Sequence, residues 1–582
     1  METQQKKEKT TKKTKNLIRE LRIAYRNLEN KKKFYRTVLF PLIILSILLF
    51  CLPFIIRLFI SQNLSLNPIT FIIGGILPLV LGILYPYIAW KNKETGINSN
   101  MHFFITHLRV LAISDLSLKG IINMIGENKA YGDLGTEIKK IGILTTQWRY
   151  PMTKTFHFIS ERTPSKILTD FLDRFSQSLD SGVDHREFIE AEQEAVLQEY
   201  KTIYETSNEN IVILNEVYVS MLIAIIFVMS FGIVLPIILG AESMNTYTYL
   251  SSFMLLATEG LLLYLLKSMI PPDHIWHQTG ERGDIEEKLR KYLRFSIIGS
   301  ILLGFLLFLS KYYFSFPFIS LIPFEILIAL AITPLLYPGI KTYLEEENIT
   351  RKEKNFFAFL QSLGSIATMK GGKINESVYY LSKKDYGVLS KYIRSLYKRL
   401  RLRIDDDATW QWFGVDTGSN FIQRSSEMFR EATSAAGNPR SVARMISFNM
   451  RRILDLRFKK FSIINTSMAL FAGITFGISF AIYTSLVISQ HLNDIVIQTG
   501  DPFNEIQSIN IGSLLHLVPP IVYSTLFIII FFVLFFHSLI ISYTIRMMRG
   551  SHAYLTLLYF VPFIWIVAIT SAAVTVFIGG LL

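Results

Sequence analysis

Long runs of apolar residues recur along the chain, and they constrain its fold more than any other feature. A helix that crosses a bilayer needs about 18 or more such residues. Nine runs meet this length, at 38–58, 69–90, 216–239, 247–266, 295–314, 318–340, 461–488, 517–543 and 555–582. Because backbone groups in lipid must satisfy their own hydrogen bonds, each run is predicted to be a helix. The chain is therefore expected to be an all-α, multi-pass membrane protein.

The charges between these runs predict an orientation. Residues 1–37 carry 13 basic and 4 acidic residues, whereas the link 489–513 carries no Lys or Arg. Basic residues also concentrate in the links after the second, fourth, sixth and eighth runs. Cytoplasmic links of membrane proteins carry the excess of Lys and Arg. We therefore expect a plasma-membrane protein with a cytoplasmic N-terminus, an external C-terminus and two long cytoplasmic links, 91–215 and 341–460.

The two long links share a sequence pattern at an offset of 255 residues. Tyr131-Gly132 aligns with Tyr386-Gly387, and apolar residues follow both pairs at helical spacing. Such a repeat predicts two homologous antiparallel helix bundles. The expected domains are a basic N-terminal segment 1–37, membrane helices in 38–90, a first helical domain 91–215, membrane helices in 216–340, a second helical domain 341–460 and membrane helices in 461–582.

The second link is much more basic than the first. Residues 91–215 hold 14 basic and 17 acidic residues, and residues 341–460 hold 23 basic and 13 acidic residues. Such a surface is typical of a solvated face, of contact with anionic membrane lipids, or of an acidic protein partner. Nucleic acid is not an expected partner, because no aromatic-interleaved binding motif accompanies the charge. The candidate docking residues are Lys391, Arg394, Lys398, Arg399, Arg401, Arg403, Arg440, Arg444, Arg451 and Arg452.

Motifs for catalysis are not found. The stretch KGGKIN (370–375) lacks the Ser or Thr of a phosphate-binding loop, since Ile374 stands at that position. Cys51 is the single cysteine, which excludes a cysteine-based zinc cluster. His274 and His277 are interpreted as part of a wet interfacial loop in preference to a zinc site. We therefore expect a scaffold rather than an enzyme, with no catalytic, cofactor-binding or metal residues.

Three ionisable residues lie well inside the apolar runs, away from the ends of these runs: Glu259, Glu325 and His537. Charged groups in lipid are costly, and they either pair between helices or line a proton or solute path. Polar contact between helices is the favoured interpretation. A secondary transporter is the alternative, but transporters place most of their mass in the membrane, whereas about 240 residues here lie in the two long links.

The arrangement resembles a known family, the type II secretion F-domain platform proteins of type IV pilus-like machines. The resemblance rests on HFFITHLRVLAISDLSLKGIINMI (102–125), on ERTPS (161–165) and on NFFAFLQSLGSIATMKGGKINESV (355–378), and it covers roughly residues 95–580. Both helical regions lead into membrane helices. The ERTPS motif and the nine apolar runs resemble those of the archaeal branch of this family. Within that branch the chain is most similar to the archaellum platform, and the adhesion-pilus platform is the alternative.

The resemblance implies a mechanism. A hexameric cytoplasmic ATPase would dock beneath the platform, and its cycle would move the cytoplasmic domains. The platform, as a homodimer, would transmit this motion to filament subunits (archaellins or pilins) during their insertion. In an archaellum it would also transmit the motion that rotates the filament. The basic candidates in 341–460 would then meet an acidic ATPase surface. The resemblance assigns no role to the basic leader 1–37.

Overall fold

The structure is a computed structural model that describes residues 25, 34–44, 46–47, 68–234, 241–271, 273–281, 283–313, 322–499 and 520–581. Helices dominate this part of the chain, and β-structure within it is limited to one antiparallel bridge between Trp276 and Ser419. The predicted all-α class is confirmed. Most of the leader 1–37 and of the run 38–58, including Cys51, lies outside the described residues, as does the link 489–513 from residue 500 onward.

Seven helical segments in the described residues are long and apolar enough to span a membrane. They match the third to ninth predicted runs. The helices are α9 (His185–Val234), α11 (Ala241–Met269), α12 (Asp284–Tyr312), α14 (Phe324–Ile332) continuing into α15 (Leu336–Met369), α20 (Pro439–Thr499), α21 (Pro520–Arg549) and α22 (Leu555–Leu581). The run 69–90 lies in α4 (Pro68–Ala112), which continues unbroken into the first long link. A multi-pass membrane protein is therefore confirmed, whereas the count of nine stays a prediction.

Helix order repeats between the two long links. In each, one long helix is followed by four short helices and a second long helix. The first set is the end of α4, α5 (Leu118–Glu127), α6 (Gly132–Thr146), α7 (Met152–Ser160), α8 (Lys166–Asp180) and α9. The second set is α15, α16 (Ile374–Ser382), α17 (Ser390–Arg401), α18 (Asp406–Thr417), α19 (Asn420–Ser434) and α20. Gly132 and Gly387 both have a left-handed φ, 52° and 59°, which glycine adopts without strain.

The chain divides into two compact units whose boundaries differ from the domains proposed from the sequence. One unit comprises residues 1–101 and 131–183, and the other comprises 102–130 and 184–582. In the first unit, α7 and α8 pack through stacked Phe156 and Phe175 rings 4.8 Å apart. The second unit contains the end of α4, α5 and α9 together with the whole second helical set.

Contacts inside the second unit show why the end of α4 belongs there. The Phe103 ring lies 5.4 Å from that of Phe421 on α19, and Asn449 of α20 donates a hydrogen bond of 3.2 Å to Thr106. His107 lies 3.2 Å from Glu431. All these residues are largely buried. The end of α4, which is the beginning of the first long link, therefore shares its core with the second long link.

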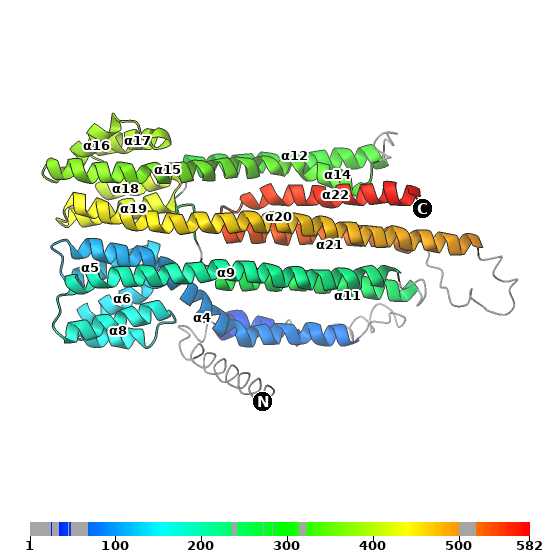
Figure 1. Cartoon of the computed structure of the whole chain (residues 1–582), viewed down its shortest axis with the longest axis horizontal. Coiled ribbons are helices and arrows are strands. Elements are labelled where there is room, and N and C mark those ends of the chain that lie inside the picture. The colour runs from blue at the N-terminus through cyan, green and yellow to red at the C-terminus, as the bar shows by residue number, and fades with distance from the viewer. Residues whose placement is uncertain are drawn as a thin grey trace. The chain divides into compact units, whose positions relative to one another are not determined.

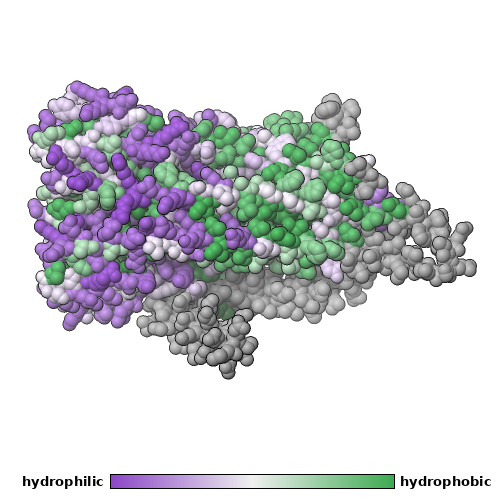
Figure 2. Space-filling view, viewed as in Figure 1, coloured by the Kyte–Doolittle hydropathy of each residue, from purple (hydrophilic) through white to green (hydrophobic). Residues whose placement is uncertain are grey.

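The long helices of the second unit form a bundle with an apolar exterior. α9, α11, α20, α21 and α22 pack side by side, and α12 and α14 pack against each other (Figure 1). On α12, Phe295, Ile301 and Phe305 are 74%, 68% and 60% exposed. Figure 2 shows hydrophobic surface over the long helices and hydrophilic surface over the end with α16–α19. Large apolar side chains on an outer face are typical of helices that contact lipid.

Candidate functional site

Helix α17 is amphipathic, and its basic residues lie on the outer side. Ile393 and Leu396 are fully buried, while Lys391, Arg394 and Lys398 are exposed. Apolar residues at a spacing of three or four form one stripe of a helix, so the residues between them face away from the core. The sequence pattern thus produces an exposed basic face on this helix.

Two of the ten docking candidates already have acidic partners within the chain. Arg399 forms an ion pair of 2.7 Å with Asp416 of α18, and Arg452 donates two hydrogen bonds of 2.8 Å to Glu194 of α9. The other eight are exposed and form no ion pair with the described residues. These eight, which we call the basic set, are Lys391, Arg394, Lys398, Arg401, Arg403, Arg440, Arg444 and Arg451. They lie on α17, on the turn after it and on the first part of α20.

A buried group of charges lies where α20 approaches its apolar run. Arg457 is 3% exposed and donates hydrogen bonds of 2.7 and 3.1 Å to the carboxylate of Asp273. It also donates to Glu353 of α15, at 3.3 Å, and its guanidinium lies 4.1 Å from the centre of the Phe421 ring. We call Arg457, Asp273 and Glu353 the Arg457 centre.

Hydrogen bonds complete the Arg457 centre on its acidic side. Tyr204 of α9 donates to Asp273 at 3.0 Å, and Ser419 donates to Glu353 at 2.6 Å. Burial alone would raise the pKa of Asp273, but the positive charges of Arg457 and Lys460 and the hydrogen bonds from Arg457 and Tyr204 hold it below its ordinary value. Asp273 is therefore a carboxylate at neutral pH, and the centre joins α9, α15 and α20 to the loop between α11 and α12.

A second buried carboxylate, Glu346 of α15, ties two loops together. It accepts hydrogen bonds from the Trp276 indole at 3.0 Å, the Ser551 hydroxyl at 2.8 Å and the backbone N–H of His552 at 2.9 Å. Trp276 belongs to the α11–α12 loop, whereas Ser551 and His552 form the turn between α21 and α22. The turns that connect membrane helices are thus fixed to the long helix α15.

The loop that holds His274 and His277 is packed rather than wet. His274 is exposed, but Ile275, Trp276 and His277 are only 2%, 6% and 7% exposed. The backbone N–H of His277 donates to the Gly418 carbonyl at 3.1 Å. The interpretation as a wet loop is therefore wrong for His277, whose backbone bonds to Gly418, a residue distant in sequence, and whose side chain is buried. In the described part of the chain no His, Cys, Asp and Glu residues cluster as a metal site would require.

Sequence reasoning missed the Arg457 centre because its members lie beside apolar runs. Arg457 precedes the run 461–488, and Asp273 follows the run 247–266. Charges at such positions are ordinarily read as topology signals. The position of Asp273 directly after Pro271-Pro272 and close to an apolar run is the one signal that could have suggested a buried partner.

Inside the bundle, Glu259 of α11 and His537 of α21 are fully buried and share a short hydrogen bond. Tyr218 of α9 donates to Glu259 at 3.5 Å, and the Thr475 hydroxyl of α20 lies 3.1 Å from the other ring nitrogen of His537. This polar chain links four helices. Glu325 is also buried, on α14, but among the described residues no hydrogen bond joins it to Glu259 or His537.

Comparison with known proteins defines the class of this fold. Residues 104–233 match the family model of the type II secretion system (T2SS), protein F. No solved structure is significantly similar. The resemblance inferred from the sequence motifs is thereby supported at the level of the domain.

Two curated relatives are similar over nearly the whole chain. The chain is 35% identical to flagella accessory protein J of Methanocaldococcus jannaschii over 92% of its own length and 93% of the relative. It is 32% identical to flagella accessory protein J of Methanococcus voltae over 95% of its length and 97% of the relative. The chain therefore belongs to the flagella accessory protein J family. The members of this family are archaeal F-domain proteins of archaellum and type IV pilus-like assembly machinery.

Proposed function

We propose that this chain is the membrane platform of an archaellum and that it couples a cytoplasmic hexameric ATPase to the insertion of filament subunits and to rotation. Family membership supports the assembly role. An adhesion-pilus platform is the near alternative, because the same fold serves both filaments. The orientation with a cytoplasmic N-terminus and the homodimeric state belong to this proposal.

Unbroken helices are the observation that carries the coupling step. α20 has 61 residues and α9 has 50. At about 1.5 Å per residue, α20 extends roughly 90 Å, about three times the hydrocarbon core of a bilayer. The Arg457 centre ties both helices to α15 and to a loop between membrane helices. A displacement of the helical region would therefore reach the membrane bundle through rigid elements.

The basic set is the proposed ATPase-docking surface. Its eight members are exposed and form no ion pair with described residues, so their charge is available to an acidic partner. Complementary charge accelerates encounter and fixes orientation, and its effect weakens with salt. Anionic lipid headgroups are the competing ligand for the same charges.

Binding of the full-length chain in lipid nanodiscs to the cell's secretion-type ATPase tests this proposal. The five charges Lys391, Arg394, Lys398, Arg401 and Arg403 are replaced by Gln, and binding is measured at low and at physiological salt. The matched control replaces five exposed lysines of the first long link, Lys119, Lys129, Lys139, Lys154 and Lys166.

We expect the first variant to insert normally, to lose salt-sensitive binding and to assemble no filaments, while the control retains both. Normal binding and filaments in the first variant would refute the assigned surface. Loss in both variants would show that total charge matters rather than this face.

The transporter alternative gains no support from the geometry. Glu259 and His537 bind each other, and among the described residues neither forms a hydrogen bond with Glu325. Polar contact between helices accounts for the pair.

A further inference from the structure

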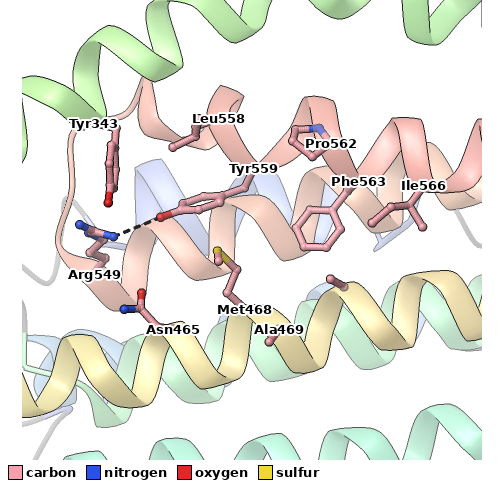
Figure 3. Close-up of a pocket in the computed structure, with 11 residues that line it drawn as sticks. Tyr343, Asn465, Met468, Ala469, Arg549, Leu558, Tyr559, Pro562, Phe563 and Ile566 are labelled. Atoms are coloured by element: carbon pink, nitrogen blue, oxygen red, sulfur yellow. Dashed lines mark hydrogen bonds between the residues drawn. The ribbon is translucent and has the colours of Figure 1, made fainter.

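A cavity of about 400 Å³ lies between α15, α20, α21 and α22 (Figure 3). Its two ends differ in chemistry. Tyr343, Asn465 and Arg549 line one end, while Met468, Phe563 and Ile566 line the other. The cavity therefore has one charged end and one apolar end.

The position of the cavity follows the membrane boundary. Arg549 is the last residue of the apolar helix α21, and Phe563 and Ile566 lie within the apolar helix α22. The charged end thus lies where the hydrocarbon layer gives way to the headgroups, and the apolar end lies deeper. Asn465, Ala469 and Pro562 are exposed at the rim, on the outer side of the bundle. The cavity is therefore accessible from lipid.

Arg549 has hydrogen-bonding capacity that the protein does not use. The closest acidic group is Glu346, whose carboxylate lies 3.9 Å from Nε of Arg549. This carboxylate already accepts three hydrogen bonds, from Trp276, Ser551 and His552. Among the described residues the buried Nε has no hydrogen-bond partner, and Nη1 makes one hydrogen bond, of 3.4 Å, to the Tyr559 hydroxyl. A guanidinium has five N–H donors, so several remain for an anion.

Aromatic rings hold the guanidinium in place. The Tyr343 and Phe461 ring centres lie 5.3 and 5.0 Å from the Arg549 guanidinium carbon. Such stacking orients the planar group and leaves its edge for a phosphate, which arginine binds in a bidentate manner.

We propose that this cavity binds one anionic phospholipid, with its phosphate on Arg549 and a hydrocarbon chain along Met468, Phe563 and Ile566. The charge at one end and the apolar walls at the other match the two parts of such a lipid, and the open rim admits it from the bilayer. The bound lipid would lie against the junction of α15, α20, α21 and α22. This site is independent of the ATPase-docking surface proposed above.

Lipid retention by the full-length protein tests the proposal. The protein is reconstituted in nanodiscs of phosphatidylcholine with or without phosphatidylglycerol, extracted in mild detergent and examined by native mass spectrometry. The variants are Arg549→Gln, which removes the charge, and Ala469→Phe, which fills the cavity from its exposed rim and leaves Arg549 intact. The matched control is Lys459→Gln, which removes an exposed charge on α20 outside the cavity.

We expect the wild type and Lys459→Gln to retain one phosphatidylglycerol. Arg549→Gln should weaken its retention about tenfold, as expected from losing a charge-assisted hydrogen bond. Ala469→Phe should abolish it, with unfolding temperature unchanged. Equal retention by the wild type and Ala469→Phe would overturn the proposal. So would displacement of phosphatidylglycerol by excess inorganic phosphate in the nanodiscs that contain this lipid, because the site would then select a free anion.

Discussion

Arg457 on α20 and Asp273 in the α11–α12 loop are 184 residues apart in the sequence, and two hydrogen bonds of 2.7 and 3.1 Å join them. The contact places a buried ion pair between a helix that extends from the helical region into the bundle and a turn between two membrane helices. The backbone is close here as well, because a Cβ on Gly550 would lie 1.7 Å from the Asp273 carbonyl oxygen. The loop is therefore held from both sides.

Replacement of Arg457 by Met should destabilise the protein strongly. It leaves Asp273 and Glu353 as buried carboxylates without their cation, which costs about 3–5 kcal/mol. Thermal unfolding in detergent measures the loss. Lys459→Met is the control, because that side chain is 65% exposed and its ion pair with Glu205 is worth less than about 1 kcal/mol. Equal unfolding temperatures for both variants would contradict a structural role for the centre.

His552 predicts a pH dependence of stability. Burial, and secondly the charge of Arg546, lower the pKa of His552 from 6.5 to about 4. Between these values the unfolded chain binds the proton more readily, so the free energy of unfolding should fall as the pH drops from 6.5 to 4, by up to about 3 kcal/mol.

Unfolding curves of the wild type and His552→Gln measure this effect, and His157→Gln, whose ring is 64% exposed, is the control. Asp273 does not interfere, since its depressed pKa places its loss of stability at lower pH. An unchanged slope in His552→Gln would show that another group titrates.

Lys398 and Arg399 are neighbours with different expected roles. Lys398 is exposed, whereas Arg399 pairs with Asp416 at 2.7 Å. Lys398→Glu should weaken ATPase binding at low salt and leave the unfolding temperature unchanged. Arg399→Glu should lower the free energy of unfolding by about 1 kcal/mol, because it opposes Asp416. If Lys398→Glu unfolds earlier and Arg399→Glu does not, the assignment of the two side chains is wrong.

Gly339 sets the distance between α15 and α22. A Cβ at this position would lie 2.6 Å from the backbone nitrogen of Leu558. Gly339→Ala should therefore cost about 1–3 kcal/mol, measured by thermal unfolding, since packed helices must separate. Gly473→Ala on α20 is the control, because a Cβ there meets nothing within 4 Å. A Gly339→Ala protein as stable as this control would mean that the helices do not approach so closely.

Glu259→Gln distinguishes a structural pair from a transport site. The substitution weakens the hydrogen bond to His537, so the unfolding free energy should fall by about 1–3 kcal/mol. Proton flux into proteoliposomes under an imposed pH gradient should be the same in both proteins. A flux in the wild type that disappears in Glu259→Gln would instead favour the transporter.

The sequence by itself determined the class of fold and the outward position of several candidate docking residues. Apolar runs predict membrane helices because the backbone in lipid can bond only to itself. The repeated Tyr-Gly pairs predict a duplicated helical arrangement, in which Gly132 and Gly387 both adopt a left-handed φ. The spacing of Ile393 and Leu396 also predicts that Lys391 and Arg394 face outward. These features depend on local periodicity, which the sequence displays directly.

Only the tertiary structure decided which basic side chains remain available to a partner and which form ion pairs within the chain. Arg399 and Arg452 resemble their exposed neighbours in sequence, yet each is paired with a carboxylate from another helix. The Arg457 centre and the joining of Glu259 to His537 likewise depend on residues distant in the chain. An ion pair forms only where two charges lie close in space, and the packing of the long helices sets that distance. A local sequence pattern therefore cannot predict these pairs.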